Sequence, residues 1–415
     1  MSAPRDRAPD GSKDAEPAAG QPSQLGRSAL AIALGGAAVL AGAVGIGRFL
    51  FTPALPMMAE GTGLGPAAAG AIASANFAGY LVGALALSFG FSPLRPAGRG
   101  TLLAALACSA ATTGLMAITD APLWWAVLRA LGGIASAVAL VAGSSLVLSR
   151  LTEARQPGLI AVHFAGVGFG IALCAALASP LFAPADGWRV LWLSGAMASL
   201  GLLAIAALLL PSTKAQAVSA GSTGPLPAGL WRLAGAYGCL GFGYVVLATF
   251  LVVMLREGGW GRSAETWAWA GVGVAAAPSV ALWSWAGRRI GTLPAFRLAM
   301  LLQAAGMALA ASVPGALALG IAGIALGGTF MGQVALGLAE AGRRAGQAAG
   351  RAMAVMTASF GIGQLLGPIL AGWAREASGG FTLPCLVATV VLIAGTALAG
   401  GSRPSRPTFS DTASR

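Results

Sequence analysis

The sequence predicts an all-α membrane protein with twelve transmembrane helices in two pseudo-symmetric six-helix bundles. Composition is the first indication, because 57% of the 415 residues are hydrophobic and only 9% are charged, whereas a soluble domain has about 25% charged residues. The second is that nearly uncharged stretches of about 20 residues, the length that crosses a bilayer, recur along the chain. The third is their grouping as six and six on either side of a polar break.

The order of the segments defines five parts. Residues 1–27 have too few apolar side chains to fold, so we expect a disordered cytoplasmic tail. An N-terminal bundle is expected over 28–210, a cytoplasmic central loop rich in Gly, Ser and Pro over 211–229, a C-terminal bundle over 230–401 and a cytoplasmic tail over 402–415. The expected spans are 28–52, 67–90, 100–119, 122–149, 158–183, 187–210, 230–255, 265–287, 295–313, 315–339, 352–374 and 381–400.

The distribution of basic residues predicts the orientation of these spans. With both termini in the cytoplasm, 19 of the 25 Lys and Arg residues fall on the cytoplasmic side and four fall in outer loops. The remaining two, Arg48 and Arg129, lie inside spans. Cytoplasmic loops of membrane proteins carry such an excess. We therefore expect a multi-pass protein of the plasma membrane (the bacterial inner membrane) with both termini cytoplasmic.

Other classes of protein lack their characteristic residues. The net charge of +12 is spread over short loops without a basic domain, so no nucleic-acid partner is expected. Four cysteines at wide spacings and a single histidine predict neither a disulfide framework nor a metal site. No phosphate-binding G-x-x-x-x-G-K-[ST] loop is present, so ATP does not drive the protein. We expect a monomer without cofactor, whose partners are a small solute, protons and the lipid bilayer.

The two arginines inside spans are the strongest candidates for a solute-binding or coupling role. Arg129 follows Pro122 by seven residues, which places it about 10 Å inside the span at 1.5 Å per residue. An arginine at the centre of a span costs about 2.5–3.5 kcal/mol on insertion scales. Arg129 could face a cavity or could anchor helices by bonding to backbone carbonyls. Arg48 precedes Thr52-Pro53 and could face a site or extend to the interface.

Five other polar side chains inside spans are candidates for binding or coupling. His163 is the single histidine, and its ordinary pKa suits proton transfer, although it could equally be a buried hydrogen-bonding group. Asn76 and Tyr80 are four residues apart and share a helix face, where they could line a cavity or bond between helices. Gln333 and Gln364 leave the same two possibilities open.

No Asp or Glu lies in the middle of a span. Proton coupling would therefore need His163, a carboxylate at the end of a span such as Glu340, or the proton of the solute itself. The charge inside the spans is positive, which favours an anionic or weakly acidic solute.

Small residues indicate where helices approach closely. Gly79 and Gly83 form a G-x-x-x-G pattern in the second span. The fifth and eleventh spans hold corresponding places in the two halves, and interruptions at corresponding places are typical of transporters built from repeats. The residues expected to have packing or conformational roles are Gly79, Gly83, Gly133, Gly166, Gly168, Gly363, Gly367 and Pro368.

Several motifs resemble those of the major facilitator superfamily. Arg129-Ala-Leu-Gly-Gly133 resembles its fourth-helix signature, and Gly287-Arg-Arg-Ile-Gly291 resembles its basic turn between helices 8 and 9. Three further motifs resemble the YbfB/YjiJ-type branch: Gly45-Ile-Gly-Arg48-Phe-Leu-Phe-Thr52-Pro53, Asn76-Phe-Ala-Gly79-Tyr80-Leu and His163-Phe-Ala-Gly166-Val-Gly168. The resemblance covers about residues 28–400 and implies a transporter, but it names no solute.

The sequence therefore predicts a secondary active transporter that works by alternating access and is coupled to protons. Export of an anionic, weakly acidic or amphipathic compound is favoured, with uptake of an organic anion as the alternative. A membrane sensor or scaffold that does not transport remains a second possibility. A membrane-embedded hydrolase using Ser144 or Ser145 with His163 is disfavoured, because no Gly-x-Ser-x-Gly pattern is present and no third residue orients the histidine. We expect no catalytic residues.

Overall fold

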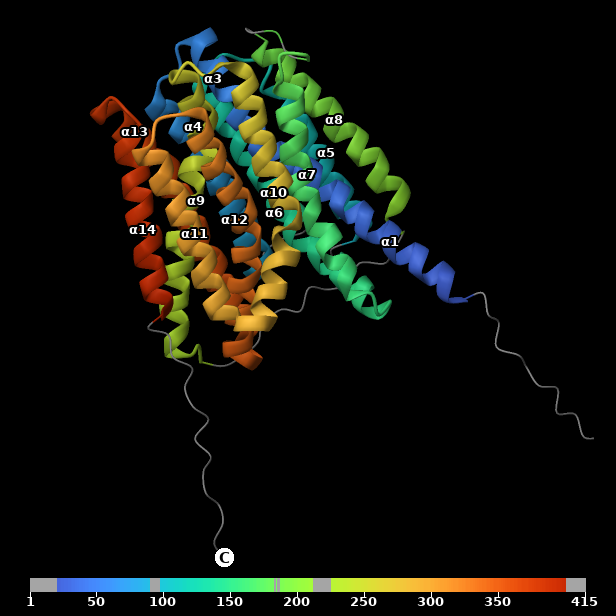
Figure 1. Ribbon diagram of the computed structural model, residues 1–415. Coiled ribbons are helices and arrows are strands. Elements are labelled where there is room, and N and C mark those ends of the chain that lie inside the picture. The colour runs from blue at the N-terminus through green and yellow to red at the C-terminus, as the bar shows by residue number, and fades with distance from the viewer. Residues whose placement is uncertain (1–20, 90–97, 183, 185–186, 212–224, 401–415) are drawn as a thin grey trace, which may run out of the picture.

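The computed structural model describes residues 21–89, 98–182, 184, 187–211 and 225–400, and within these ranges every long element is a helix. Figure 1 shows the helices side by side in one barrel-like body. The first half contains α1 (Gln21–Leu40), η1 (Ala41–Ile46), α2 (Gly47–Phe49), α3 (Phe51–Thr62), α4 (Pro66–Phe89), α5 (Arg99–Leu115), α6 (Pro122–Glu153), α7 (Ile160–Ala178) and α8 (Trp188–Leu209). The second contains α9 (Ala228–Glu257), α10 (Gly261–Ile290), α11 (Thr292–Ser312), α12 (Ala316–Ala345), α13 (Ala349–Ser378) and α14 (Thr382–Gly400).

The described chain contains twelve membrane-length helical segments, as the sequence predicts. Nine stretches are long and apolar enough to span a bilayer, and one of them, Ala316–Ser378, holds both α12 and α13. The short α5 and the more polar α10 run beside these and complete the twelve. A 3₁₀ turn precedes α7 and another precedes α13, so the two halves repeat even in this detail.

The first span differs from its prediction in length and regularity. Four elements, α1 to α3 with the π-helical η1 between α1 and α2, form one membrane stretch from Ser28 to Thr62. It continues ten residues beyond the expected end at 52, through Pro53 and Pro56. α1 itself begins at Gln21, before the expected start of the span. The expected tails and most of the central loop (1–20, 401–415 and 212–224) lie outside the described residues.

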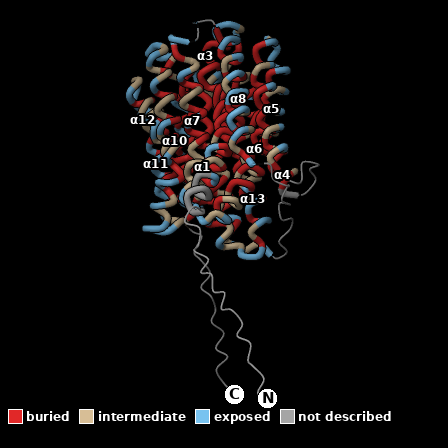
Figure 2. Tube along the Cα trace, turned by 90° about the vertical axis from the view of Figure 1, so that its right-hand side faces the viewer, coloured by how far each residue is buried: buried red, intermediate tan, exposed pale blue. Residues whose placement is uncertain are grey.

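The helices pack as two bundles that meet along two equivalent pairs. Within the first half α4 packs on α6, α5 on α8 and α1 on α7; within the second α10 packs on α12, α9 on α13 and α11 on α14. Between the halves α4 packs on α13 and α7 on α10. Each of these pairs joins the second span of one half to the fifth span of the other, so a pseudo-twofold axis relates them. Figure 2 shows that buried residues continue through the middle of the body.

Glycine allows both contacts between the bundles to be close. A Cβ atom added at Gly168 of α7, or at Gly273 of α10, would lie within 3.0 Å of the backbone of the facing helix. At Gly70 of α4 it would lie within 3.0 Å of the Pro368 backbone on α13, and at Gly372 within 3.0 Å of the Pro66 backbone. The two bundles are therefore in backbone contact at both pairs.

Ion pairs close one end of the boundary between the bundles, which we call the ion-pair end. Here Arg256, at the end of α9, donates to both carboxylate oxygens of Glu60 on α3 at 2.7 and 2.8 Å. The same guanidinium donates to Glu265 on α10, with Nη2 2.7 Å from Oε2. Nearby, the Glu376 carboxylate accepts from the Ala67 amide at 3.3 Å, another bond between the bundles.

The opposite end, which we call the termini end, contains the start of α1 and the last turn of α14. Its best-defined ion cluster lies within the second bundle. Glu340 of α12 accepts from Arg343, Arg344 and the Thr292 hydroxyl at 2.5–3.0 Å. This cluster joins α11 to α12 and so stabilises one bundle without linking it to the other.

Candidate solute-binding site between the bundles

The site begins with the irregular middle of the first span. Its η1 segment has a wide π turn, and Pro53 has no N–H to donate to the carbonyl of Phe49 one turn earlier. Single π turns of this kind occur frequently at functional sites. The carbonyls of Gly47 and Arg48 accept hydrogen bonds from Arg129.

Arg129 lies inside the first bundle, where it holds three segments together. Its Nη1 is 2.7 Å from the Gly47 carbonyl oxygen and its Nη2 is 2.9 Å from that of Arg48. The Asn76 amide of α4 donates to the Arg129 carbonyl at 2.8 Å. The guanidinium also lies 5.1 Å from the ring centre of Phe51. Arg129 and Asn76 thus bond between helices, which is one of the two possibilities that the sequence left open.

Arg48 lies nearby but is arranged differently. The residue is 7% exposed, yet its Nε and Nη2 atoms have no hydrogen-bond partner among the described residues. The guanidinium lies 4.4 Å from the ring centre of Tyr80 and 4.9 Å from that of Phe77. These cation–π contacts stabilise the charge but leave N–H donors free. Since buried polar groups are nearly always paired, this side chain is a candidate for binding a ligand.

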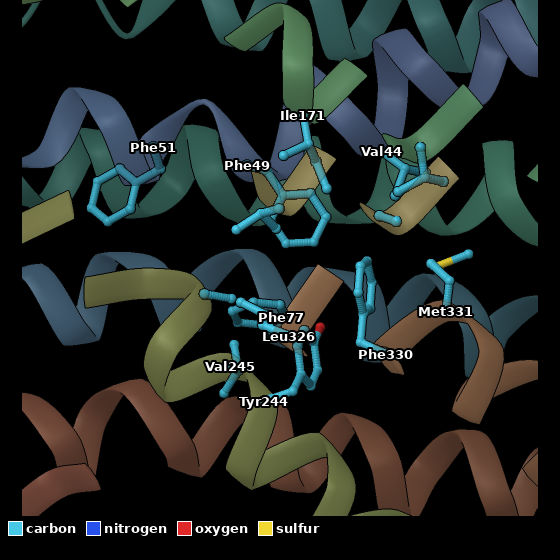
Figure 3. Close-up of a cluster of buried hydrophobic side chains, with 14 of the residues drawn as sticks. Val44, Phe49, Phe51, Phe77, Ile171, Tyr244, Val245, Leu326, Phe330 and Met331 are labelled. Atoms are coloured by element: carbon cyan, nitrogen blue, oxygen red, sulfur yellow. The ribbon is translucent and has the colours of Figure 1, made fainter. Parts of the chain in front are cut away.

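Aromatic rings of the second bundle face this region. Tyr244 of α9 stacks on Phe330 with ring centres 5.4 Å apart and planes at 8°, and on Phe360 at 5.7 Å and 4°. The Gln364 amide donates to the Tyr244 hydroxyl. Phe49 of the first bundle meets Phe330 at 5.9 Å. Figure 3 shows Phe49 and Phe77 from one bundle and Tyr244 and Phe330 from the other in one layer of side chains.

We call this group of residues the interface site: Arg48, Phe77, Tyr80, Tyr244, Phe330, Phe360, Gln333 and Gln364. Arg48 contacts the Tyr80 ring of the first bundle, and the next residue, Phe49, meets Phe330 of the second bundle, so this stretch of the first span reaches both bundles. Gln333, three residues after Phe330 on α12, is fully buried and neither atom of its amide has a partner in the described part of the chain. The Oε1 atom of Gln364 is also unpaired. Unpaired buried amides are costly, and a polar ligand would satisfy them.

His163 lies apart from the interface site. Its Nε2 is 3.1 Å from the Ser144 hydroxyl, and its Nδ1 faces the Gly36 backbone of α1. Gly36 precedes Arg48 by twelve residues, which is about 18 Å of helix. The ring is fully buried inside the first bundle. No carboxylate among the described residues pairs with it, so the Ser144–His163 contact lacks the third group of a hydrolase triad.

The predicted packing glycines lie at close helix contacts. Gly168 faces α10 of the other bundle, whereas the others lie within one bundle. In the first bundle Gly79 and Gly83 contact α6, Gly133 contacts the backbone of Asn76 and Tyr80, and Gly166 contacts Ala37; in the second, Gly363 and Gly367 contact α9. Pro368 contacts Gly70 across the boundary, and the Ser74 hydroxyl donates to the nearby Leu365 carbonyl at 2.7 Å.

Sequence reasoning did not identify Tyr244, Phe330 and Phe360, because a ring on an apolar helix usually packs in the core. One signal was present. The chain has only three tyrosines, and Tyr80, Tyr237 and Tyr244 all lie well inside spans. Tyrosines of membrane proteins are instead enriched at the membrane–water interfaces.

Two six-helix bundles with a polar site at their boundary define a transporter of the major facilitator type. The chain belongs to the family described as "Uncharacterised MFS-type transporter YbfB", which matches residues 40–399. This membership confirms the resemblance drawn from the motifs. The family is one of transporters, so the protein is a multi-pass membrane transporter and not an enzyme.

Solved structures share the fold. A point mutant of the nucleoside transporter NupG has a TM-score of 0.68 at 16% identity, covering 90% of this chain and 98% of that one. A bacterial homologue of the human lysosomal transporter Spinster, in an inward-facing and occupied conformation, has a TM-score of 0.68 at 15% identity, covering 91% and 96%. At such identities only the fold is shared. No curated protein matches the chain.

Proposed function

We propose that the protein is a secondary active transporter that moves a small organic anion, or a weakly acidic or amphipathic compound, by alternating access, with export as the favoured direction. The observation that carries this proposal is the buried guanidinium of Arg48, which has unpaired donors at the boundary between the bundles. A buried charge without a partner is strongly unfavourable. An anionic solute would supply the missing partner.

The charges around Arg48 support an anion over a cation. Arg129 is close enough to interact electrostatically with Arg48, and among the described residues neither arginine forms an ion pair with a carboxylate. The local field is therefore positive. Hydrogen bonds between a guanidinium and an anion are roughly twice as strong as neutral ones.

The ion pairs support an inward-facing arrangement. With cytoplasmic termini, the ion-pair end faces outward, and it is closed by Arg256 between Glu60 and Glu265. We propose a monomer of the bacterial inner membrane with this topology. Reporter fusions after Ala348 should then be cytoplasmic and those after Gly258 and Gly379 external, whereas the reverse pattern would overturn the orientation.

The test of solute class is transport by membrane vesicles that contain the full chain. In everted vesicles we expect gradient-driven accumulation of organic acids, and not of amines or sugars. Arg48→Gln should lower the initial rate at least tenfold, because it removes the charge. Arg297→Gln makes the same change at an exposed residue outside the superfamily motifs and should keep the rate. Transport of amines or sugars that survives Arg48→Gln would overturn the proposal, and accumulation only in right-side-out vesicles would favour uptake.

Proton coupling through His163 is the second part of the proposal. His163 is the chain's single histidine, and arginine does not deprotonate in proteins. His163→Gln keeps a hydrogen-bonding group beside Ser144 but cannot titrate. Accumulation driven by an imposed pH gradient should collapse in this variant, while exchange of labelled for unlabelled solute persists. If both continue unchanged, the proton moves with the solute or through Glu340.

A further inference from the structure

We infer that the solute of the interface site is a planar aromatic anion, whose carboxylate binds Arg48 while its ring stacks on the aromatic side chains of the second bundle. This inference rests on the proposed transport of anions and narrows it to one chemical class. Three independent features carry it: the chain of ring contacts, the positions of the tyrosines, and the edge of the guanidinium that is left free.

A continuous chain of ring contacts follows the boundary between the bundles. From Tyr237 it passes to Phe360 (ring centres 4.9 Å apart), then to Tyr244 (5.7 Å) and Phe330 (5.4 Å), within the second bundle. Phe49 of the first bundle continues it, at 5.9 Å from Phe330 and 6.3 Å from Trp269. The contacts of Phe49 must break when the bundles separate. Phe330 and Trp269 then lose a ring contact each, and a planar aromatic solute can replace these contacts.

The three tyrosines of the chain lie in or beside this group: Tyr237 and Tyr244 belong to the chain of ring contacts, and Tyr80 contacts Arg48. Tyr80, Tyr237 and Tyr244 are 6%, 1% and 2% exposed. The Tyr237 hydroxyl donates to the Val334 carbonyl at 3.1 Å. Each tyrosine combines a flat apolar face with a polar edge. A site lined in this way suits a solute with the same character, a ring that carries polar substituents.

The unpaired edge of Arg48 has the geometry for a carboxylate. Its Nε and Nη2 atoms lie on the same side of the planar guanidinium, and these are the two unpaired atoms. Two parallel N–H groups match the two oxygens of one carboxylate. Phe77 and Tyr80 contact the guanidinium within 5 Å of their ring centres, which leaves this edge free. The charge and the stacking surface therefore bind different parts of one solute.

A matched pair of acids tests the inference. Benzoate and cyclohexanecarboxylate have the same charge and nearly the same size, but only benzoate is planar and aromatic. Titration calorimetry on the purified full chain at pH 7.5, where both acids are ionised, should give at least tenfold tighter binding of benzoate. An aromatic pair contributes roughly two- to tenfold in affinity, and the solute can contact more than one ring.

Substitutions then test which side chains cause the preference for benzoate. Tyr244→Leu and Phe330→Leu each remove a ring but keep an apolar side chain, so they should reduce the preference for benzoate severalfold and leave binding of cyclohexanecarboxylate nearly unchanged. Tyr244→Phe keeps the ring and should keep the preference. If a leucine variant does not fold, as judged by gel filtration, the comparison of the two acids on the unmodified protein still decides.

The outcomes separate this inference from the proposal on which it rests. Equal binding of the two acids, abolished for both by Arg48→Gln, would overturn the aromatic preference and leave anion transport standing. Binding of neither acid, together with transport of amines or sugars, would overturn both. A benzoate preference that persists in both leucine variants would show that stacking on this chain of rings is not its source.

Discussion

Arg48 and Arg129 are both buried arginines in the first bundle, but they make opposite use of their donors. Arg129 donates from both terminal nitrogens to backbone carbonyls and leaves Nε unpaired, while Arg48 leaves both Nε and Nη2 unpaired. Hydrogen bonds from a charged group contribute about 1.5–3 kcal/mol each. One arginine therefore stabilises the fold, whereas the other lowers the stability of the empty protein.

Replacing Arg129 by lysine should reduce both stability and transport. Lysine lacks the planar fork that reaches the Gly47 and Arg48 carbonyls together, so about 1.5–3 kcal/mol of hydrogen bonding should be lost. We expect a lower melting temperature of the purified protein and slower transport at an unchanged amount in the membrane. A variant with a normal melting temperature and normal transport would show that this pair of hydrogen bonds is dispensable.

Replacing Arg48 by glutamine should affect stability and transport differently. The change removes an unpaired buried charge, so the melting temperature should stay the same or rise while transport falls. Differential scanning fluorimetry without solute measures the first property, and vesicle transport measures the second. A marked fall in melting temperature would mean that Arg48 stabilises the fold and would weaken its assignment to the solute.

How far the sequence could predict these side chains depends on the range of their contacts. A charge in an apolar stretch is visible locally, and so Arg48, Arg129 and His163 could all be selected. Which of them binds carbonyls could not be predicted, because the acceptors, the Gly47 and Arg48 carbonyls, lie 82 and 81 residues from Arg129 in the sequence. Tyr244 can be recognised as part of the site only from its ring contacts with Phe330 and Phe360, which lie on other helices.

Among the helices, the pair Gly168 and Gly273 sets how closely the bundles approach at the α7–α10 contact. Gly168 of α7 faces the backbone of Gly273 and Ala277 on α10. The sequence predicted close approach from the spacing of small residues, but spacing does not identify the partner helix. Gly79 faces α6 inside its own bundle, while Gly168 faces the other bundle. A pattern of small residues indicates a closely packed helix face, but only the folded structure shows which helix packs against that face.

A side chain at Gly168 should therefore block transport. In Gly168→Val, the new atoms would overlap the backbone of α10, so the two bundles could not reach their present contact. We expect at least a tenfold loss of transport rate with normal membrane insertion. Gly201→Val on α8 is the matched control, because no atom lies within 4 Å of a Cβ there. Normal transport by Gly168→Val would mean that the α7–α10 contact is not needed in the cycle.

For the whole molecule, hydropathy and charge were enough to predict the number of spans and their division into two bundles. These properties are sums over many residues and tolerate local errors. The conformational state could not be predicted in this way. It depends on a few bonds between residues far apart in sequence, such as Glu60 with Arg256 and Ser74 with the Leu365 carbonyl.

Weakening the ion-pair end should shift the population toward its open form. Glu60→Gln removes one charge from the pair with Arg256. Because the Glu60 side chain is 54% exposed, we expect the 0.2–1 kcal/mol typical of exposed pairs, or roughly a 1.4- to 5-fold change in population. A cysteine at Thr266, which lines a small cavity beside Arg256, should react faster with an impermeant thiol reagent. An unchanged labelling rate would show that this pair does not hold the end closed.

The two carboxylates on Arg256 also have a consequence for energy use during the cycle. Glu265 belongs to the same bundle as Arg256, and its side chain is only 8% exposed, so the two can remain bonded when Glu60 departs. The guanidinium then never faces the opening without a counter-charge. Only the partly solvated ion pair between Arg256 and Glu60 has to break, and its strength of about 0.2–1 kcal/mol is close to thermal energy. A contact of this strength can break and re-form spontaneously, so opening of the ion-pair end needs no large input of free energy.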